Sequence, residues 1–149
     1  LLAISIVSFM SGYTFNSNNI STKKPKKKVA VNDSELKNFT ILSPDSTYLI
    51  FAFSYSCPHC MNSIENLKQY ENSGVVDKVI GIAVKDDNKS VLFEKRYKPN
   101  FEIKEVSKHD IIKISSSLPR SFYVYNDTIQ FSLSGTLPSA YVLKDALEK

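Results

Sequence analysis

The stretch "TYLIFAFSYSCPHC", residues 47–60, joins an apolar run to the two cysteines of this 149-residue chain. Residues 47–54 are aromatic or β-branched at most positions, with no separation into a polar and an apolar face. This pattern predicts a central strand of a parallel sheet, buried on both sides. Cys57 and Cys60 follow directly, two residues apart. A buried strand that leads into a Cys-x-x-Cys pair is the feature around which we interpret the rest of the chain.

Apolar residues recur at helical spacing after this strand, at Cys60, Ile64, Leu67 and Tyr70. The spacing predicts a helix that opens at Cys57 and buries one face. Unpaired backbone N–H groups at a helix N-terminus favour an anion, so a thiolate at Cys57 would be stabilised there. Cys60, one turn further on, would face inward.

The two cysteines are candidates for a redox dithiol or for part of a metal site. A disulfide between them closes too short a loop to add much stability, which disfavours a purely structural bridge. A structural zinc site needs four ligands, and the histidines are His59, inside the motif, and His109. The residues therefore favour a redox dithiol in which Cys57 exchanges and Cys60 resolves the mixed disulfide.

The dipeptide between the cysteines, Pro58-His59, affects the sulfur of Cys57. Pro58 suits a first helical turn, because the N–H that it lacks would have no helical partner. His59 adds a donor or a positive charge beside the thiolate, which lowers the pKa of Cys57 and favours the reduced form.

Further elements are predicted downstream. We expect strands at 75–84 and 101–106, a helix capped by residues 86–88 and stopped by Pro99, a hairpin at 121–133 turned at Asn126-Asp127, and a last helix opened by Pro138. This order indicates an α/β sheet with helices on its faces.

The chain divides into three predicted segments. Residues 1–15 are mostly apolar and fit a signal peptide or the remainder of a longer membrane anchor. Residues 16–34 form a polar, basic linker, and residues 35–149 the folded domain. A lysine cluster after an anchor favours the cytoplasmic side. We nevertheless expect an exported protein, on the periplasmic side of the bacterial inner membrane or free in the periplasm after cleavage.

The net charge of +4 comes from the linker. Five of the 19 basic residues precede Val29, which leaves 14 against 15 acidic residues in the remainder. A nucleic-acid reader carries its positive charge on the folded face, so this distribution excludes nucleic acid as the expected partner.

The residues around the motif resemble a known family. "FAFSYSCPHC" is similar to the active-site region of the thioredoxin superfamily, and its CPHC motif resembles that of the disulfide oxidase DsbA. Fifty-eight residues separate Cys60 from Pro119, which lies in "SLPRSFYVYND" and matches the family's cis-proline. This spacing is similar to that of the TlpA/ResA-like group of membrane-anchored, exported thioredoxins. Gly135 lines up with the glycine that borders the active site, and the resemblance covers residues 35–149.

The resemblance implies a thioredoxin fold, with a central mixed sheet flanked by helices, and thiol–disulfide oxidoreductase activity. It also implies partners: cysteine-containing exported proteins and a membrane redox partner. We expect a monomer that uses no metal and no organic cofactor. The implied site consists of catalytic Cys57 and Cys60, supporting Pro58, His59 and Tyr55, and substrate-binding Leu118 and Pro119.

The chain departs from thioredoxin at two positions. Phe51 replaces a buried acid, and we expect it to pack in the core; Ser56 replaces a tryptophan. Together with the Pro58-His59 dipeptide, Phe51 in place of the acid favours an oxidising Cys57–Cys60 disulfide/dithiol couple. Arg120 and His109 are expected at the surface. Three alternatives stay open: a dedicated reductase for cytochrome c maturation, a tethered Cu(I) metallochaperone, and an interaction module without turnover.

Overall fold

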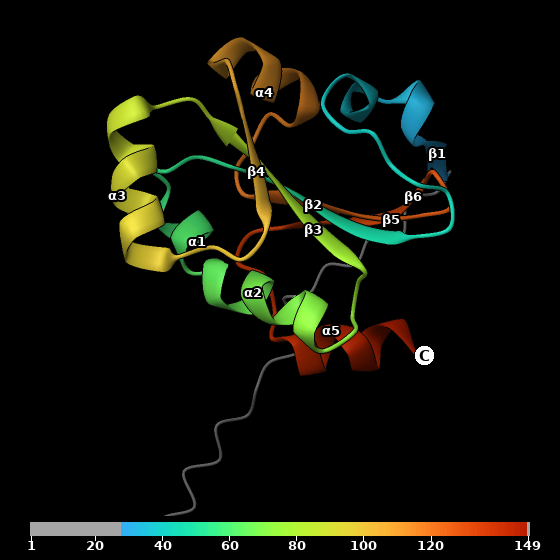
Figure 1. Cartoon of the computed structure of the whole chain (residues 1–149). Helices are drawn as coiled ribbons and strands as arrows, with labels where there is room; N and C mark the ends of the chain where they lie inside the picture. The colour runs from blue at the N-terminus through green and yellow to red at the C-terminus, as the bar shows by residue number, and fades with distance from the viewer. Residues whose placement is uncertain (1–27, 149) are drawn as a thin grey trace, which may run out of the picture.

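The computed structural model describes residues 28–148, so the expected signal or anchor at 1–15 lies outside the described residues. Six strands form one mixed sheet in the order β1-β6-β5-β2-β3-β4 (Figure 1). Strands β2, β3 and β4 are parallel to one another, whereas β5 is antiparallel to β2, β6 to β5 and β1 to β6. The strands are β1 (Val29–Ala30), β2 (Thr47–Phe53), β3 (Lys78–Val84), β4 (Glu102–Val106), β5 (Arg120–Tyr125) and β6 (Thr128–Ser134).

Strand β2 is central and buried on both faces, as the sequence predicted. It pairs with β3 on one side and β5 on the other, and residues 48–53 are all buried. Each face of the sheet must therefore be covered by other elements. These are the α-helices α1 (Pro58–Met61), α2 (Ile64–Asn72), α3 (Asp87–Tyr97), α4 (Lys108–Ile114) and α5 (Ala140–Leu147), and the 3₁₀ helices η2 (Val31–Asp33) and η3 (Glu35–Asn38).

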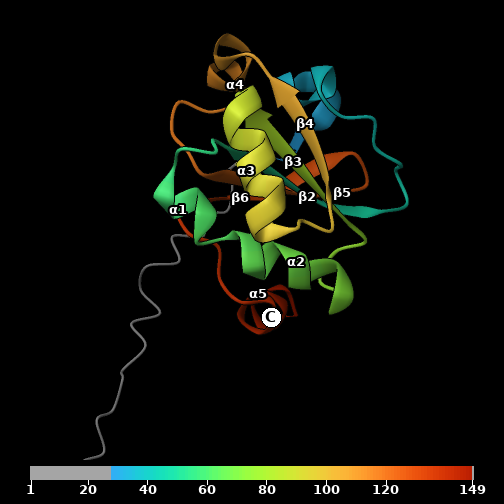
Figure 2. The same cartoon turned by 60° about the vertical axis from the view of Figure 1, so that its left-hand side comes forward.

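The sheet separates two hydrophobic cores. Helices α1, α2, α3 and α5 pack with Leu49, Phe51 and Phe53 on one face. Helix α4 and the 3₁₀ helices pack with Ile50 and Ala52 on the other. Figures 1 and 2 show α4 and the N-terminal 3₁₀ segment on one side of the strands, and α1, α2 and α5 on the other. The predicted α/β architecture with covered faces is confirmed.

The predicted hairpin is confirmed, with its turn at Asn126 and Asp127. Both residues have positive φ, 50° and 51°, as the favoured two-residue hairpin turn requires. Asp86 caps α3 by accepting a hydrogen bond from the backbone N–H of Lys89, as the sequence also predicted.

The folded domain begins earlier than residue 35. Val29 and Ala30 pair with β6, and the Val31 and Leu36 side chains are buried. Residues 29–34, which were expected in the linker, therefore belong to the fold. The short apolar run after the lysines pairs with the free edge of β6, a long-range contact that local composition does not show.

The predicted helix from Cys57 is interrupted. Helix α1 ends at Met61 and α2 begins at Ile64, with Ser63 between them. The Ser63 hydroxyl donates a hydrogen bond to the carbonyl of His59, 3.3 Å away. Side-chain bonds of this kind to the preceding turn bend helices.

The last helix begins two residues after Pro138, which was expected to open it. Ser139 is its cap and accepts from the N–H of Val142. Across residues 28–148, we find no helix with the length and apolar character needed to cross a membrane.

Candidate functional site

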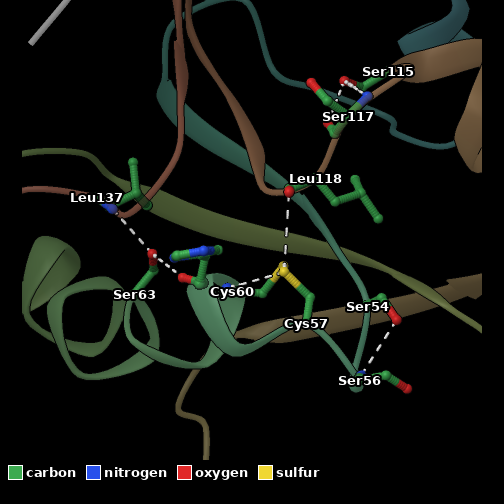
Figure 3. The surroundings of a disulfide bond; sticks show 10 residues. Ser54, Ser56, Cys57, Cys60, Ser63, Ser115, Ser117, Leu118 and Leu137 are labelled. Atoms are coloured by element: carbon green, nitrogen blue, oxygen red, sulfur yellow. Dashed lines mark hydrogen bonds between the residues drawn. A yellow bond between two sulfur atoms is a disulfide. The ribbon is translucent and has the colours of Figure 1, made fainter.

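The cysteine motif lies at the C-terminal end of β2, where the chain turns into α1. The backbone N–H of Cys57 donates to the carbonyl of Ser54, 3.0 Å away, and closes this turn. Cys57 then caps α1, and a disulfide joins it to Cys60 (Figure 3). The predicted pair is thus held at the junction of a central strand and a helix.

The two sulfur atoms have different environments. Cys60 is fully buried, with 0% of its surface exposed, and packs in the core with α2. Cys57 is only partly buried. The backbone N–H of Cys60 donates to the Cys57 sulfur at 3.2 Å. A partner can therefore reach Cys57 from solvent, whereas Cys60 is accessible only through Cys57.

Helix α1 has only four residues, which limits how far it can stabilise a thiolate at Cys57. Helix-end effects arise in the first turn, where N–H groups have no helical partner. One such group, from Cys60, already points at the Cys57 sulfur. Pro58 and His59 occupy the first two helical positions, and both are exposed. The His59 imidazole therefore lies at the surface that an approaching thiol would meet.

The Leu118-Pro119 segment reaches the motif from far along the chain. The peptide bond between these residues is cis, as predicted. The Leu118 carbonyl oxygen lies 4.0 Å from the Cys57 sulfur (Figure 3). Strand β5, which begins at Arg120, pairs with β2 and fixes this approach. The sheet thus brings the two halves of the expected site together.

Tyr55 supports the loop before Cys57. Its ring contacts Phe53 and Phe93, with centroids 5.4 and 5.2 Å away, and its hydroxyl donates to Glu105 at 2.9 Å. Burial, together with the Glu105 carboxylate, raises the pKa of Tyr55 above its usual range. Tyr55 therefore stays neutral and links the motif loop to β4.

Comparison with known proteins relates this architecture to solved structures. No protein-family profile matches the chain, and no curated protein matches it in sequence. A thiol:disulfide interchange protein of the thioredoxin family from Chlorobium tepidum TLS superposes with a TM-score of 0.56, at 18% identity, covering 70% of this chain and 81% of that one. The chain has a thioredoxin fold.

Two further solved structures share this thioredoxin fold. One is a secreted Mycobacterium tuberculosis disulfide oxidoreductase homologous to E. coli DsbE, with a TM-score of 0.58 at 17% identity, covering 69% of this chain and 81% of that one. The other is a thiol:disulfide interchange protein from Bacteroides sp., with a TM-score of 0.56 at 11% identity, covering 87% and 90%.

A groove adjoins the motif of the thioredoxin fold on the α4 side. It has a volume of about 350 Å³ and runs beside Leu118 and Ser56. Ile111 and Ile112 supply apolar surface, while Asp86 and Lys108 also line it. The groove therefore offers apolar surface beside Leu118 and Ser56.

Sequence reasoning missed a contact at Ser56. The Lys89 ammonium donates to the Ser56 hydroxyl at 2.7 Å and pairs with Asp86 at 3.2 Å. Hydrogen bonding, first from the Lys89 backbone N–H, holds the pKa of Asp86 below its usual range. The contact joins α3 to the residue before Cys57, and no local motif marks it.

Arg120 and Gly135 border the site from the hairpin. The Arg120 guanidinium donates to the hydroxyls of Ser132 and Ser134, so it is engaged by β6. Gly135 has φ +84°, a conformation that other residues rarely adopt, and its N–H donates to the carbonyl of Pro119 at 3.3 Å. His109 is exposed at the second position of α4, as expected.

Metal ligands do not gather in the described part of the thioredoxin fold. Within residues 28–148, no group of three or more His, Cys, Asp or Glu side chains converges. Any ion held by Cys57 and Cys60 would have no third protein ligand of these types there.

Proposed function

We propose that this protein is a thiol–disulfide oxidoreductase that exchanges electrons between its Cys57–Cys60 pair and the cysteines of exported proteins. One observation carries the proposal. In a thioredoxin fold, the sulfur of the partly exposed residue Cys57 lies 4.0 Å from the Leu118 carbonyl, while its disulfide partner Cys60 is buried. This arrangement offers one sulfur for attack and one for resolution.

Oxidation of a substrate dithiol follows from this asymmetry. A substrate thiolate attacks the Cys57 sulfur, a new sulfur–sulfur bond forms, and the Cys57–Cys60 bond breaks. Cys60 leaves as a thiolate and takes up a proton. The second substrate thiol loses a proton and attacks the substrate sulfur of the mixed disulfide, which releases Cys57 as a thiolate. Two electrons have then passed to the protein, and the reverse sequence reduces a substrate disulfide.

The surroundings of Cys57 suit this chemistry. The N–H of Cys60 stabilises negative charge on the released Cys57 sulfur. The Leu118 carbonyl is placed to accept a hydrogen bond from the backbone of an extended substrate beside its cysteine. The groove along Ile111 and Ile112 takes a neighbouring apolar side chain of that substrate.

The proposed site of action is outside the cytoplasm. The chain's two cysteines are both in the motif, and residues 1–15 have the composition of a signal or anchor. A secreted disulfide oxidoreductase is among the solved structures with this fold. A membrane redox partner would restore the starting state of the pair, and the protein would act as a monomer.

Trapping of mixed disulfides tests the proposed function. Cys60→Ala removes the resolving thiol, so when Cys57 attacks a peptide that carries a disulfide and releases one peptide sulfur as a thiolate, the other should remain covalently attached to Cys57 and be visible by mass spectrometry. Cys57→Ala is the matched control and should trap nothing. Trapping by Cys57→Ala and not by Cys60→Ala would reverse the roles, and equal trapping by the two variants would contradict the assignment of separate roles. Failure of the unaltered protein to exchange with any dithiol or disulfide would leave an interaction module or a metal-binding protein.

A further inference from the structure

A buried serine connects the motif helix to the opposite border of the site. Ser63, one turn after Cys60, is 0% exposed. Its hydroxyl donates to the His59 carbonyl at 3.3 Å and accepts from the Leu137 N–H at 3.0 Å (Figure 3). The bond from Leu137 is buried, so water does not compete for it, whereas the bond to His59 is only part-buried.

A second side chain holds the same backbone segment. Asn66, three residues after Ser63, donates from its amide to the Leu137 carbonyl at 2.8 Å. Ser63 immediately precedes α2 and Asn66 is the third residue of that helix, so both contacts come from its N-terminal end. The N–H and the carbonyl of Leu137 are therefore both bound at the start of α2.

The segment held in this way reaches the substrate side of the site. Gly135, two residues before Leu137, donates to the Pro119 carbonyl at 3.3 Å. The adjacent Leu118 carbonyl faces the Cys57 sulfur. A continuous series of contacts thus connects Ser63, residues 135–137, the Leu118-Pro119 segment and the Cys57 sulfur.

We propose that Ser63 is a positioning residue that sets the gap between the Cys57 sulfur and the Leu118 carbonyl, and so favours cysteines in extended peptides over small thiols. This inference rests on the proposed exchange activity. A peptide cysteine needs both Cys57 and the neighbouring carbonyl in register, whereas a small thiol needs only the sulfur. Displacement of residues 135–137 therefore weakens peptide binding and leaves small-thiol exchange intact.

Ser63→Ala in the full 149-residue chain tests the proposal. The substrates are a short dithiol peptide and dithiothreitol, each oxidised in a single turnover by the disulfide form of the protein, so that KM is the substrate concentration at half the maximal rate and kcat is that maximal rate constant. Loss of the hydrogen bond between Ser63 and the Leu137 N–H should raise the KM for the peptide about fivefold, which is the effect of about one hydrogen bond. The kcat should change little. The rate with dithiothreitol should stay within about twofold of the unaltered protein. Ser63→Thr, which keeps the hydroxyl, should restore peptide binding.

Two variants keep the outcome interpretable. Asn66→Ala releases the Leu137 carbonyl from a part-buried position and should shift peptide KM in the same direction if Ser63→Ala does not fold. Thr40→Val is the matched control, because it removes a buried hydroxyl bond, to Leu36, in the other core. It should lower stability without changing the peptide KM.

The results separate this proposal from the proposed function. If the unaltered protein exchanges with both substrates but Ser63→Ala and Asn66→Ala change both rates equally, or change nothing beyond Thr40→Val, the positioning role is wrong. If the unaltered protein exchanges with neither substrate, the oxidoreductase function itself fails.

Discussion

Phe51 and Ser121 lie opposite each other on β2 and β5, and both are buried. Phe51 stacks on Phe53 with ring centroids 5.4 Å apart, so the expectation that it packs in the core is confirmed. The Ser121 hydroxyl has no hydrogen-bond partner within residues 28–148. The position at which the thioredoxin resemblance places an acid is thus an aromatic core residue beside an unpaired hydroxyl.

Ser121→Ala should stabilise the protein. A buried hydroxyl without a partner loses its hydration on folding and gains nothing in return, at a cost of about 1–3 kcal/mol. The smaller side chain leaves a modest cavity, so we expect a net rise of about 1 kcal/mol in the free energy of unfolding. Urea titration measures it, and a loss of stability would show that the hydroxyl is bonded in solution.

Cys57 should be the reactive thiol of the reduced protein. It is partly exposed and faces the Cys60 N–H, whereas Cys60 is buried. Because the thiolate is the reactive form and the Cys60 N–H stabilises it, iodoacetamide near pH 6 should modify Cys57 first. Peptide mapping by mass spectrometry locates the label. Predominant labelling of Cys60 would mean that the roles are exchanged.

The disulfide/dithiol couple of Cys57 and Cys60 should be more oxidising than that of thioredoxin. The exposed His59 lies in the first turn after Cys57, where a donor or positive charge stabilises the thiolate. We expect a reduction potential between the values of about −270 mV for thioredoxin and about −120 mV for DsbA, nearer the latter. Equilibration with glutathione measures it. A potential at or below that of thioredoxin would instead favour a dedicated reductase.

Replacement of the histidine tests its contribution. His59→Gly should lower the potential toward that of thioredoxin, and each 30 mV corresponds to about 1.4 kcal/mol. His109 offers a matched control, because it is also exposed and also second in a short helix, α4. His109→Gly should leave the potential unchanged. Equal shifts in both variants would assign the effect to helix propensity.

Asp77 should make stability depend on pH in the acid range. Its carboxylate accepts from the backbone N–H and the hydroxyl of Thr47 at 2.7 and 2.6 Å, and these bonds lower the pKa of Asp77. A lowered folded-state pKa stabilises the protein above the unfolded value of about 3.9, and this stabilisation is lost as pH falls through the folded value.

Asp77→Asn keeps an acceptor oxygen and removes the charge. After allowance for exposure of this group, we expect a loss of about 1 kcal/mol at pH 7. The difference between variant and unaltered protein should shrink as pH falls through the lowered folded-state pKa of Asp77, because the aspartic acid then becomes protonated in both folded and unfolded states. Unfolding by urea at pH 7 and at a series of lower pH values checks the sign, and a pH-independent difference would rule out the charge as its source.

The domain should lie outside the cytoplasm. In cells that express the chain, a membrane-impermeant maleimide added to intact spheroplasts should label Cys57 after mild reduction. A cytoplasmic cysteine protein in the same cells controls for leakage. Labelling that requires lysis would place the domain on the cytoplasmic side, as the lysine run before Val29 favours.

The sequence predicts most of the fold because its signals there are local. Strand β2 is a continuous apolar run, the Asn126-Asp127 turn uses residues that tolerate positive φ, and Asp86 caps the helix that follows it. Each of these features needs only its neighbours in the chain. The thioredoxin fold and the proximity of Leu118 to Cys57 follow from them through the family resemblance.

The features that the sequence does not predict depend on distant partners. The pairing of Val29 and Ala30 with β6 requires a free strand edge nearly 100 residues later in the chain. The buried contact of Ser63 is made with the N–H of Leu137, and nothing in the local spacing distinguishes Ser63 from an ordinary polar helix residue. Sequence patterns therefore do not predict features that depend on a hydrogen bond to a backbone group far away in the chain.

The short span between Cys57 and Cys60 also has a thermodynamic consequence. A bridge that closes so few residues restricts the unfolded chain little, so breaking it leaves most of the folding free energy in place. The proposed rounds of electron transfer would therefore need no refolding step. Folding and disulfide formation are linked in one thermodynamic cycle. A difference in denaturation midpoint between the disulfide and dithiol forms therefore reports how strongly the fold favours one redox form over the other.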